Sequence, residues 1–181
     1  MDIAIDERKL SFASEYDISA PDATYYARKA ILSFNDSLTL KTTDGNVLAQ
    51  IEGHFSPLRS KHDFELSDGR TYEFHCEELW KRVFICAGNQ ETYHLYEHKG
   101  LNYSIFKGDQ QLAAFTKNRV VLGKGNHYDI RMNADGDLIL VLCMVLTINT
   151  AEHDDDDSSV TIDFGNIGPE GRAFDETWEP R

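Results

Sequence analysis

One uninterrupted apolar segment, Leu138–Ile148, limits what this chain can fold into more than any other feature. Its eleven residues are LILVLCMVLTI, with ten apolar side chains and a single threonine. A helix or strand built from this segment has no polar face to turn toward water, so it must be buried on all sides. The rest of the chain therefore has to enclose it.

The residue pattern leaves the secondary structure of this segment open. Ile139 and Val141 are among several β-branched residues, which favour a buried strand. Eleven residues is long for a strand in this chain, and Asp135 or Asp137 could cap the start of a helix that ends at Asn149. Periodicity alone does not decide between the two.

Short alternating runs separated by Asp-Gly turns fill the residues before this segment. Leu38 and Leu40 alternate with polar residues ahead of Asp44-Gly45, and the alternation resumes at Val47. Glycine supplies the positive φ that tight hairpin turns need. Evenly spaced hairpins predict a β-barrel or a β-sandwich. Their series also favours strands for Tyr25–Leu32 and His75–Arg82, which fit either a strand or a short helix.

The composition fits one soluble domain with a substantial core. The chain has 181 residues, of which 41% are hydrophobic. The apolar segment is shorter than the about 20 residues that cross a bilayer, and no signal peptide is visible at the start. The three cysteines, Cys76, Cys86 and Cys143, have no metal-ligand spacing, and their odd number argues against a disulfide scaffold. We therefore expect a protein of the reducing cytoplasm.

The acidic charge is concentrated near the end of the chain. The formal net charge is −13. Residues 151–181 carry ten acidic and two basic side chains, whereas residues 81–131 carry eight basic and four acidic ones. An acidic total disfavours nucleic acid as a partner, because phosphate binding needs a basic surface. The basic surplus of residues 81–131 still allows a local anion site.

Several stretches together resemble the LURP-one-related family, within the tubby C-terminal-like group that also includes phospholipid scramblases. They are ERKLSFASEYDI, YARKAILSFNDSLTLKTTDGNVLAQIEG, NYSIFKGDQQLAAFTK and HYDIRM with DGDLILVLCMVLTIN, between about Glu7 and Asn149. The resemblance implies a closed antiparallel barrel of about twelve strands around a central hydrophobic C-terminal helix at about 137–149. The barrel domain would span 1–150, and residues 151–181 are expected to form an acidic, flexible tail. The flexibility is expected above all of residues 151–159, whereas residues 160–181 contain apolar side chains and either pack on the barrel as an extended strand or bind something else.

The same resemblance points to a phosphoinositide or another anionic headgroup, which tubby-like members bind through basic residues on the barrel surface. The candidate residues here come from the basic surplus of residues 81–131 and not from a match to the tubby lipid site. They are Lys81, Arg82, Lys107, Lys117, Arg119 and Lys124. Clustered on the outer face of the barrel, they could hold a phosphate group through charge-assisted hydrogen bonds. The alternative is that they are solvated side chains that keep strand edges from pairing.

No residue pattern points to a metal, a cofactor or catalysis. His94 and His98 have the i, i+4 spacing that binds zinc only on a helix, and the surrounding alternation favours a strand. The run Asp154–Asp157 lacks the alternating ligands and glycine turn of a calcium loop. Cys86 is expected to be a core thiol, and no nucleophile motif is present. We expect no metal, no cofactor and no enzymatic activity.

Two hypotheses on function follow. The first is a non-enzymatic soluble binding or scaffolding module, cytoplasmic or peripheral at a membrane, that recognises an anionic phospholipid headgroup or a protein on its outer barrel face. The second is an autoregulated adaptor, in which the acidic tail with Phe174 and Trp178 docks on a protein partner or on the barrel's own basic face. Scramblase-like activity is disfavoured because no transmembrane segment is visible.

Overall fold

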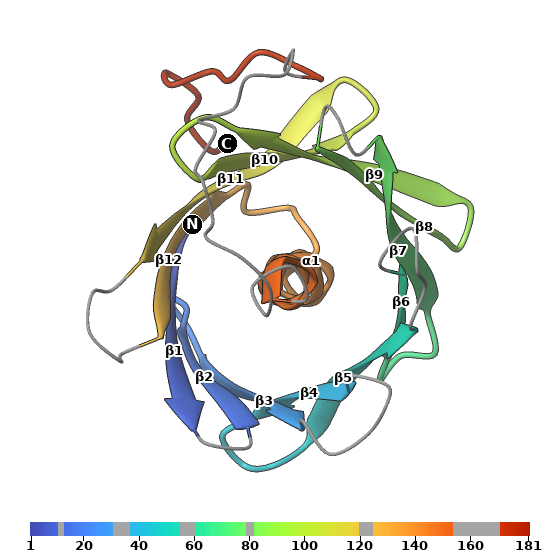
Figure 1. Cartoon of the computed structure of the whole chain (residues 1–181), viewed down its shortest axis with the longest axis vertical. Coiled ribbons are helices and arrows are strands. Elements are labelled where there is room, and N and C mark those ends of the chain that lie inside the picture. Colours follow the sequence, from blue (N-terminus) through green and yellow to red (C-terminus); the bar gives the residue numbers. More distant parts are fainter. Residues whose placement is uncertain (11–12, 31–36, 55–60, 79–81, 120–124, 154–170) are drawn as a thin grey trace.

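Twelve antiparallel strands form one closed barrel around a helix in the computed structural model of this chain (Figure 1). The structure describes residues 1–10, 13–30, 37–54, 61–78, 82–119, 125–153 and 171–181. Strands that follow one another in sequence pair with each other, and the barrel closes where the first strand pairs with the last, from Asp2↔Arg131 to Asp6↔His127. The predicted closed barrel with a central helix is therefore confirmed.

The strands follow the predicted hairpin series. They are β1 (Asp2–Leu10), β2 (Ala13–Ser19), β3 (Thr24–Ala30), β4 (Ser37–Thr42), β5 (Val47–His54), β6 (Lys61–Leu66), β7 (Thr71–Glu78), β8 (Val83–Gly88), β9 (Glu91–His98), β10 (Asn102–Lys107), β11 (Gln110–Arg119) and β12 (Asn126–Met132). The helix, α1, spans Leu138–His153. The two segments that fitted either a strand or a helix contribute strand residues to β3 and β7.

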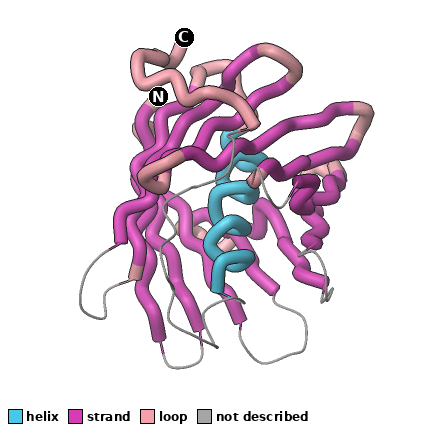
Figure 2. The backbone as a smooth tube through the Cα atoms, turned by 45° about the horizontal axis from the view of Figure 1, so that its top comes forward, coloured by secondary structure: helices cyan, strands magenta, loops and turns pink. Residues whose placement is uncertain are grey.

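Glycines with positive φ make tight turns at the end of the barrel where α1 begins. Gly45 and Gly69 both have a φ of 87°. The Gly45 amide donates to the Thr42 carbonyl oxygen at 3.0 Å, and the Gly69 amide donates to that of Leu66 at 2.9 Å. The predicted Asp-Gly turns are thus confirmed here. We call this the start end of the barrel, and the opposite end, which α1 approaches as it finishes, the far end (Figure 2).

Asp137 begins α1 and ties it to the rim of the barrel. Its Oδ1 accepts a hydrogen bond from the Leu140 amide at 3.1 Å, which caps the helix. Its Oδ2 accepts a hydrogen bond from Arg70, whose guanidinium also contacts Asp68 at 2.8 Å and the Tyr72 hydroxyl at 3.3 Å. Hydrogen bonds to Asp137 and Asp68 raise the pKa of Arg70. A charged link therefore holds the helix start against β6 and β7.

The helix can be apolar on every side because the barrel surrounds it on every side. From Leu140 to Ile148 each residue is at most 2% exposed. Thr147 donates its hydroxyl to the Cys143 carbonyl oxygen at 2.7 Å, so it needs no polar surroundings. A helix satisfies its own backbone groups, whereas a strand alone in the lumen would bury unpaired ones. This decides between the two predicted structures, and α1 ends at His153, beyond the predicted 149.

Alternate strand residues point at the helix and form the core. Large rings fill most of this space: Tyr16, Tyr103, Tyr128, Phe64 and Phe74 are all fully buried. Small residues make room for α1 elsewhere, since Ala27, Ala49 and Ala113 have no exposed surface. The wall and the helix thus share one packed interior.

Candidate functional site

Part of the outer barrel wall is buried although it faces away from the helix. Ser104, Phe106 and Ala114 alternate with inward-facing core residues, yet they are only 2%, 6% and 4% exposed. Strand register aligns Val83, Tyr96, Ser104 and Ala114 in one transverse row across β8–β11. We call the outward-facing residues Val83, Tyr96, His98, Ser104, Phe106 and Ala114 the outer strip. A buried outer wall implies a cover.

The segment 171–181, here the C-terminal segment, lies against the barrel over β9–β11 (Figure 1). The side chains of Arg172 and Phe174 are half-buried, whereas Gly171, Ala173 and Asp175 are exposed. The chain bends at Gly171 and Arg172 and turns at Glu176 and Thr177, and from Gly171 to Asp175 its side chains alternate between exposed and half-buried. Residues 171–181 therefore pack on the barrel, which is one of the two alternatives for residues 160–181, although they do so without forming a strand. Residues 154–170 lie outside the described residues.

Arg172 makes the most specific contact with the outer strip. Its guanidinium carbon lies 3.9 Å from the centre of the Phe106 ring. A guanidinium over an aromatic face gains about 0.5–2 kcal/mol, with the larger value where water is excluded. The same guanidinium lies 3.9 Å from the fully exposed carboxylate of Asp109. The Arg172 side chain is thus held by the Phe106 ring and by the Asp109 carboxylate.

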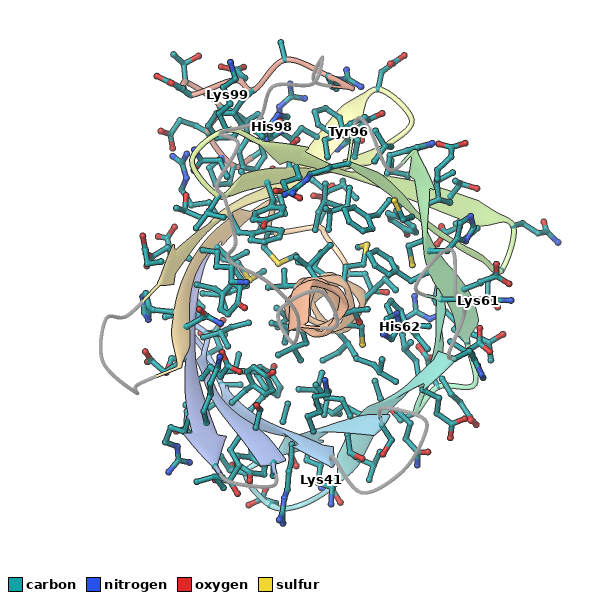
Figure 3. All side chains as sticks on the ribbon, in the orientation of Figure 1. Lys41, Lys61, His62, Tyr96, His98 and Lys99 are labelled. Atoms are coloured by element: carbon teal, nitrogen blue, oxygen red, sulfur yellow. The ribbon has the colours of Figure 1, made fainter. Side chains whose placement is uncertain are left out.

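Phe174 contacts a buried histidine in the outer strip. The centres of the Phe174 and His98 rings are 4.9 Å apart. Figure 3 shows Tyr96 and His98 on the outer side of β9, toward the C-terminal segment. The His98 Nε2 and the Ser104 hydroxyl share a hydrogen bond of 2.7 Å, which holds the imidazole in place. The ring of Phe174 therefore rests on a fixed aromatic surface.

Gly171 approaches the strip closely through its backbone. A Cβ placed on Gly171 would lie 2.5 Å from Val83 Cγ2 and 3.3 Å from Tyr96 Cδ1. Carbon atoms in ordinary contact are about 3.5–4.0 Å apart. Only glycine therefore fits at this position without a shift of Val83.

The end of the C-terminal segment is held by the residues that lead into α1. The Arg181 amide donates to Asn133 Oδ1 at 2.8 Å, and the Ala134 amide donates to a main-chain oxygen of Arg181 at 3.0 Å. Arg131 and Glu179 add an exposed ion pair of 3.3 Å. The C-terminal segment is thus attached at both ends. Its first residues contact β9 and β10, and its last residue contacts the connection between β12 and α1.

The predicted basic residues that the structure describes do not converge on an anion site on the outer face of the barrel. Lys107 lies at the start end, where its Nζ donates to Glu91 at 2.5 Å. Arg82 lies at the far end and pairs with Glu97. Lys117 is 4% exposed and faces the lumen, because it is in register with the inward-facing Tyr128. Lys81 and Lys124, and the side chain of Arg119, lie outside the described residues.

Lys117 belongs to a layer of inward-facing ionisable side chains at the far end. The others are Glu7, Lys29, His62 and Glu97, all at most 9% exposed; His62 points inward in Figure 3. Glu7 accepts hydrogen bonds from the Asn126 amide at 3.0 Å and its side-chain nitrogen at 2.6 Å. Cations at this end also suit the negative pole of the helix dipole. The layer explains why a lysine can be buried here.

The described residues offer little for catalysis or metal binding. Burial raises the pKa of the Cys86 and Cys143 thiols, so neither forms the thiolate that a nucleophile needs. Among the described residues no group of three or more His, Cys, Asp or Glu side chains could hold a metal ion. His94 and His98 share the outer face of β9, but the His94 ring stacks on Tyr96 and the His98 ring contacts the segment. The Asp154–Asp157 run is outside the described residues.

A pocket on the neighbouring part of the wall is acidic. It has a volume of about 390 Å³ and lies over β5–β7. Glu52, Asp63 and Glu65 line it, and Glu52 is directly opposite Asp63 across the strand pair. Like charges in this arrangement disfavour an anion. This face therefore gives no support to headgroup binding.

The outer strip was missed in the sequence, although one signal for it was present. Strand β11 contains the unbroken run Leu112–Phe115, in which all four residues are buried. A strand with one face in water alternates, whereas a continuous apolar run indicates that both faces are covered. The run therefore marks where the outer wall is shielded, but it does not show what shields it.

Comparisons with known proteins do not assign this chain to a class, so its class rests on the fold and the site. No family model, no curated protein and no solved structure matches the chain. Within the described residues, no helix is both long enough and apolar enough to cross a membrane. The structure defines a closed twelve-stranded barrel that is filled by its own helix and carries an outer strip covered in part by its own C-terminal segment.

Proposed function

We propose that this protein is a non-enzymatic binding module that recognises a short segment of another protein on its outer strip. Its own C-terminal segment occupies the strip as an autoregulatory ligand. The contact between Arg172 and Phe106 carries this proposal, because it places a side chain of the docked segment on a pre-formed aromatic surface. A partner segment with similar chemistry would compete for the same surface.

Mass action favours another protein over a second copy of this chain as the external partner. A segment tethered to its own site acts at an effective concentration on the order of millimolar. Exchange of segments between copies is therefore disfavoured at micromolar protein concentration. An external partner therefore occupies the outer strip only if it binds more tightly than the tethered segment, or if it binds after that segment has been released.

The fold also bears on the hypotheses drawn from the sequence. We also propose that this chain is related to the LURP-one-related family. A closed barrel around an apolar helix supports this relationship. Recognition of an anionic headgroup has less support, because Lys107 and Arg82 are paired with carboxylates and Lys117 is buried. The buried thiols suit the reducing cytoplasm, which we propose as its compartment.

Fluorescence anisotropy with a labelled peptide tests the proposal. The probe is GRAFDETWEPR, the sequence of residues 171–181. The full chain is compared with the full-length double variant Arg172→Ala/Phe174→Ala, the released variant. We expect the released variant to bind the probe at least about tenfold more tightly, because its own segment competes less.

Two further variants locate the binding. Phe106→Ala in the released background removes the ring beneath arginine and should weaken binding. Tyr26→Ala, a change on the outer face of the distant β3, serves as the matched control and should not. Equal affinity for wild type and the released variant, or the same loss in both further variants, would contradict the proposal.

A further inference from the structure

We infer that the outer strip recognises a particular sequence, Gly-Arg-x-Phe, in a short exposed segment. The inference rests on the proposed function and adds the chemistry of the partner. That partner is a protein with an exposed segment in which glycine precedes arginine, and phenylalanine follows two residues after the arginine. Gly171, Arg172 and Phe174 show how each of these positions is recognised.

The arginine position depends on a flat cation. Arg172 lies over the Phe106 ring at 3.9 Å, with the Asp109 carboxylate 3.9 Å away at its edge. A planar guanidinium can stack on the ring and face the acid at once, whereas the compact, strongly hydrated ammonium of lysine cannot. Lysine is therefore a poorer ligand despite the same charge.

The phenylalanine position depends on spacing. The bend at Gly171 and Arg172 leaves Arg172 in contact with Phe106 and Phe174, two residues later, in contact with His98. Arg172 and Phe174 accordingly both face the barrel, while Ala173 between them is exposed. Phe174 meets His98, which is 1% exposed and held by Ser104. A phenylalanine one residue earlier or later would point into solvent.

The glycine position depends on space. The φ of Gly171 is not in the left-handed region, so its backbone conformation is open to other residues. The restriction comes from Val83, whose Cγ2 would lie 2.5 Å from an added Cβ. Any side chain at this position must push Val83 aside, and Val83 is itself only 5% exposed.

A panel of peptides on the released variant tests the three positions. The parent GRAFDETWEPR is compared with peptides that carry Gly171→Ala, Arg172→Lys or Phe174→Ala. Each change is expected to weaken binding by about five- to tenfold or more. Glu176→Gln, a change at an exposed residue, is the control and should leave affinity unchanged.

A compensating variant distinguishes steric recognition of glycine from a general loss of peptide binding. Val83→Ala in the released variant opens the space beside Gly171, so it should restore binding of the Gly171→Ala peptide relative to the parent. Failure of every peptide to bind would reject the proposed function itself. Tight but equal binding of all peptides would leave that function standing and overturn this inference, as would a Val83→Ala protein that still discriminates against the alanine peptide.

Discussion

Arg172 and Phe106 form a cation–π contact of 3.9 Å that joins the C-terminal segment to β10. Of the contacts along the segment, this one combines charge, aromatic area and fixed geometry. Its expected contribution, about 0.5–2 kcal/mol, is too small to make docking irreversible. The nearby exposed ion pair with Asp109 adds little more. A competing ligand can therefore displace the C-terminal segment from the outer strip.

Removing the Phe106 ring should loosen the segment while the barrel stays folded. Trypsin cleaves after Arg172, whose side chain must leave Phe106 to enter the protease. We predict that Phe106→Ala raises the rate at which residues 173–181 are lost by roughly 2–30-fold, in line with the expected contact energy. Mass spectrometry follows the product, and Tyr26→Ala provides the control. An unchanged rate in Phe106→Ala would show that the contact does not hold the segment.

Asp137 performs two tasks at the start of α1, and substitutions can separate them. Asparagine keeps the cap on the Leu140 amide but loses the charge that pairs with Arg70. We expect Asp137→Ala to lower the free energy of unfolding by about 1–2 kcal/mol and Asp137→Asn by clearly less. Urea denaturation measures both. Identical losses would mean that the cap contributes nothing.

The position of α1 in the lumen predicts a severe effect at Leu142, which has no exposed surface. A carboxylate there would be buried without a partner, at a cost of several kcal/mol or more. Leu142→Asp should therefore abolish cooperative folding, whereas Leu142→Met should cost less than about 1.5 kcal/mol. Thermal denaturation followed by circular dichroism compares them. A cooperatively folded Leu142→Asp protein would mean that this segment lies elsewhere.

His127 should make stability depend on pH. Its hydrogen bond to Asp6 at 2.7 Å raises its pKa above 6.5, and Asp129 at 3.2 Å acts in the same direction. A raised pKa in the folded state stabilises the protein below pH 6.5, and this gain disappears as the pH rises through the folded-state pKa. His127→Gln should thus cost more at about pH 5.5 than at about pH 8.5, and less than about 1 kcal/mol because the ion pairs are exposed. A cost that is constant with pH would contradict this.

Much of the fold could be predicted because its determinants are local. Asp44-Gly45 and Asp68-Gly69 specify turns through the positive φ of glycine, whatever the rest of the chain does. The burial of Leu138–Ile148 followed from its lack of any polar face. Its helical state did not, because strand and helix bury such a run equally well. The closed wall decides it, since a strand in the lumen would have no partner.

The site was harder to predict because it depends on register across strands. Lys117 lies two residues after the core residue Phe115 and therefore shares its inward face, which a strict reading of alternation would have shown. No local pattern brings Arg82 to Glu97, or Arg172 to Phe106; the topology does. The basic surplus of residues 81–131 is thus real in composition, but its described members are divided between the two ends of the barrel and the lumen.

The central claim is that the outer strip is the recognition surface, and chemical-shift mapping tests it most directly. The released variant, labelled with ¹⁵N, is titrated with the GRAFDETWEPR peptide. We predict that the largest shifts appear at Tyr96, His98, Phe106 and Ala134. Shifts that centre on β3–β6, or none at a peptide concentration that saturates the anisotropy signal, would contradict the account.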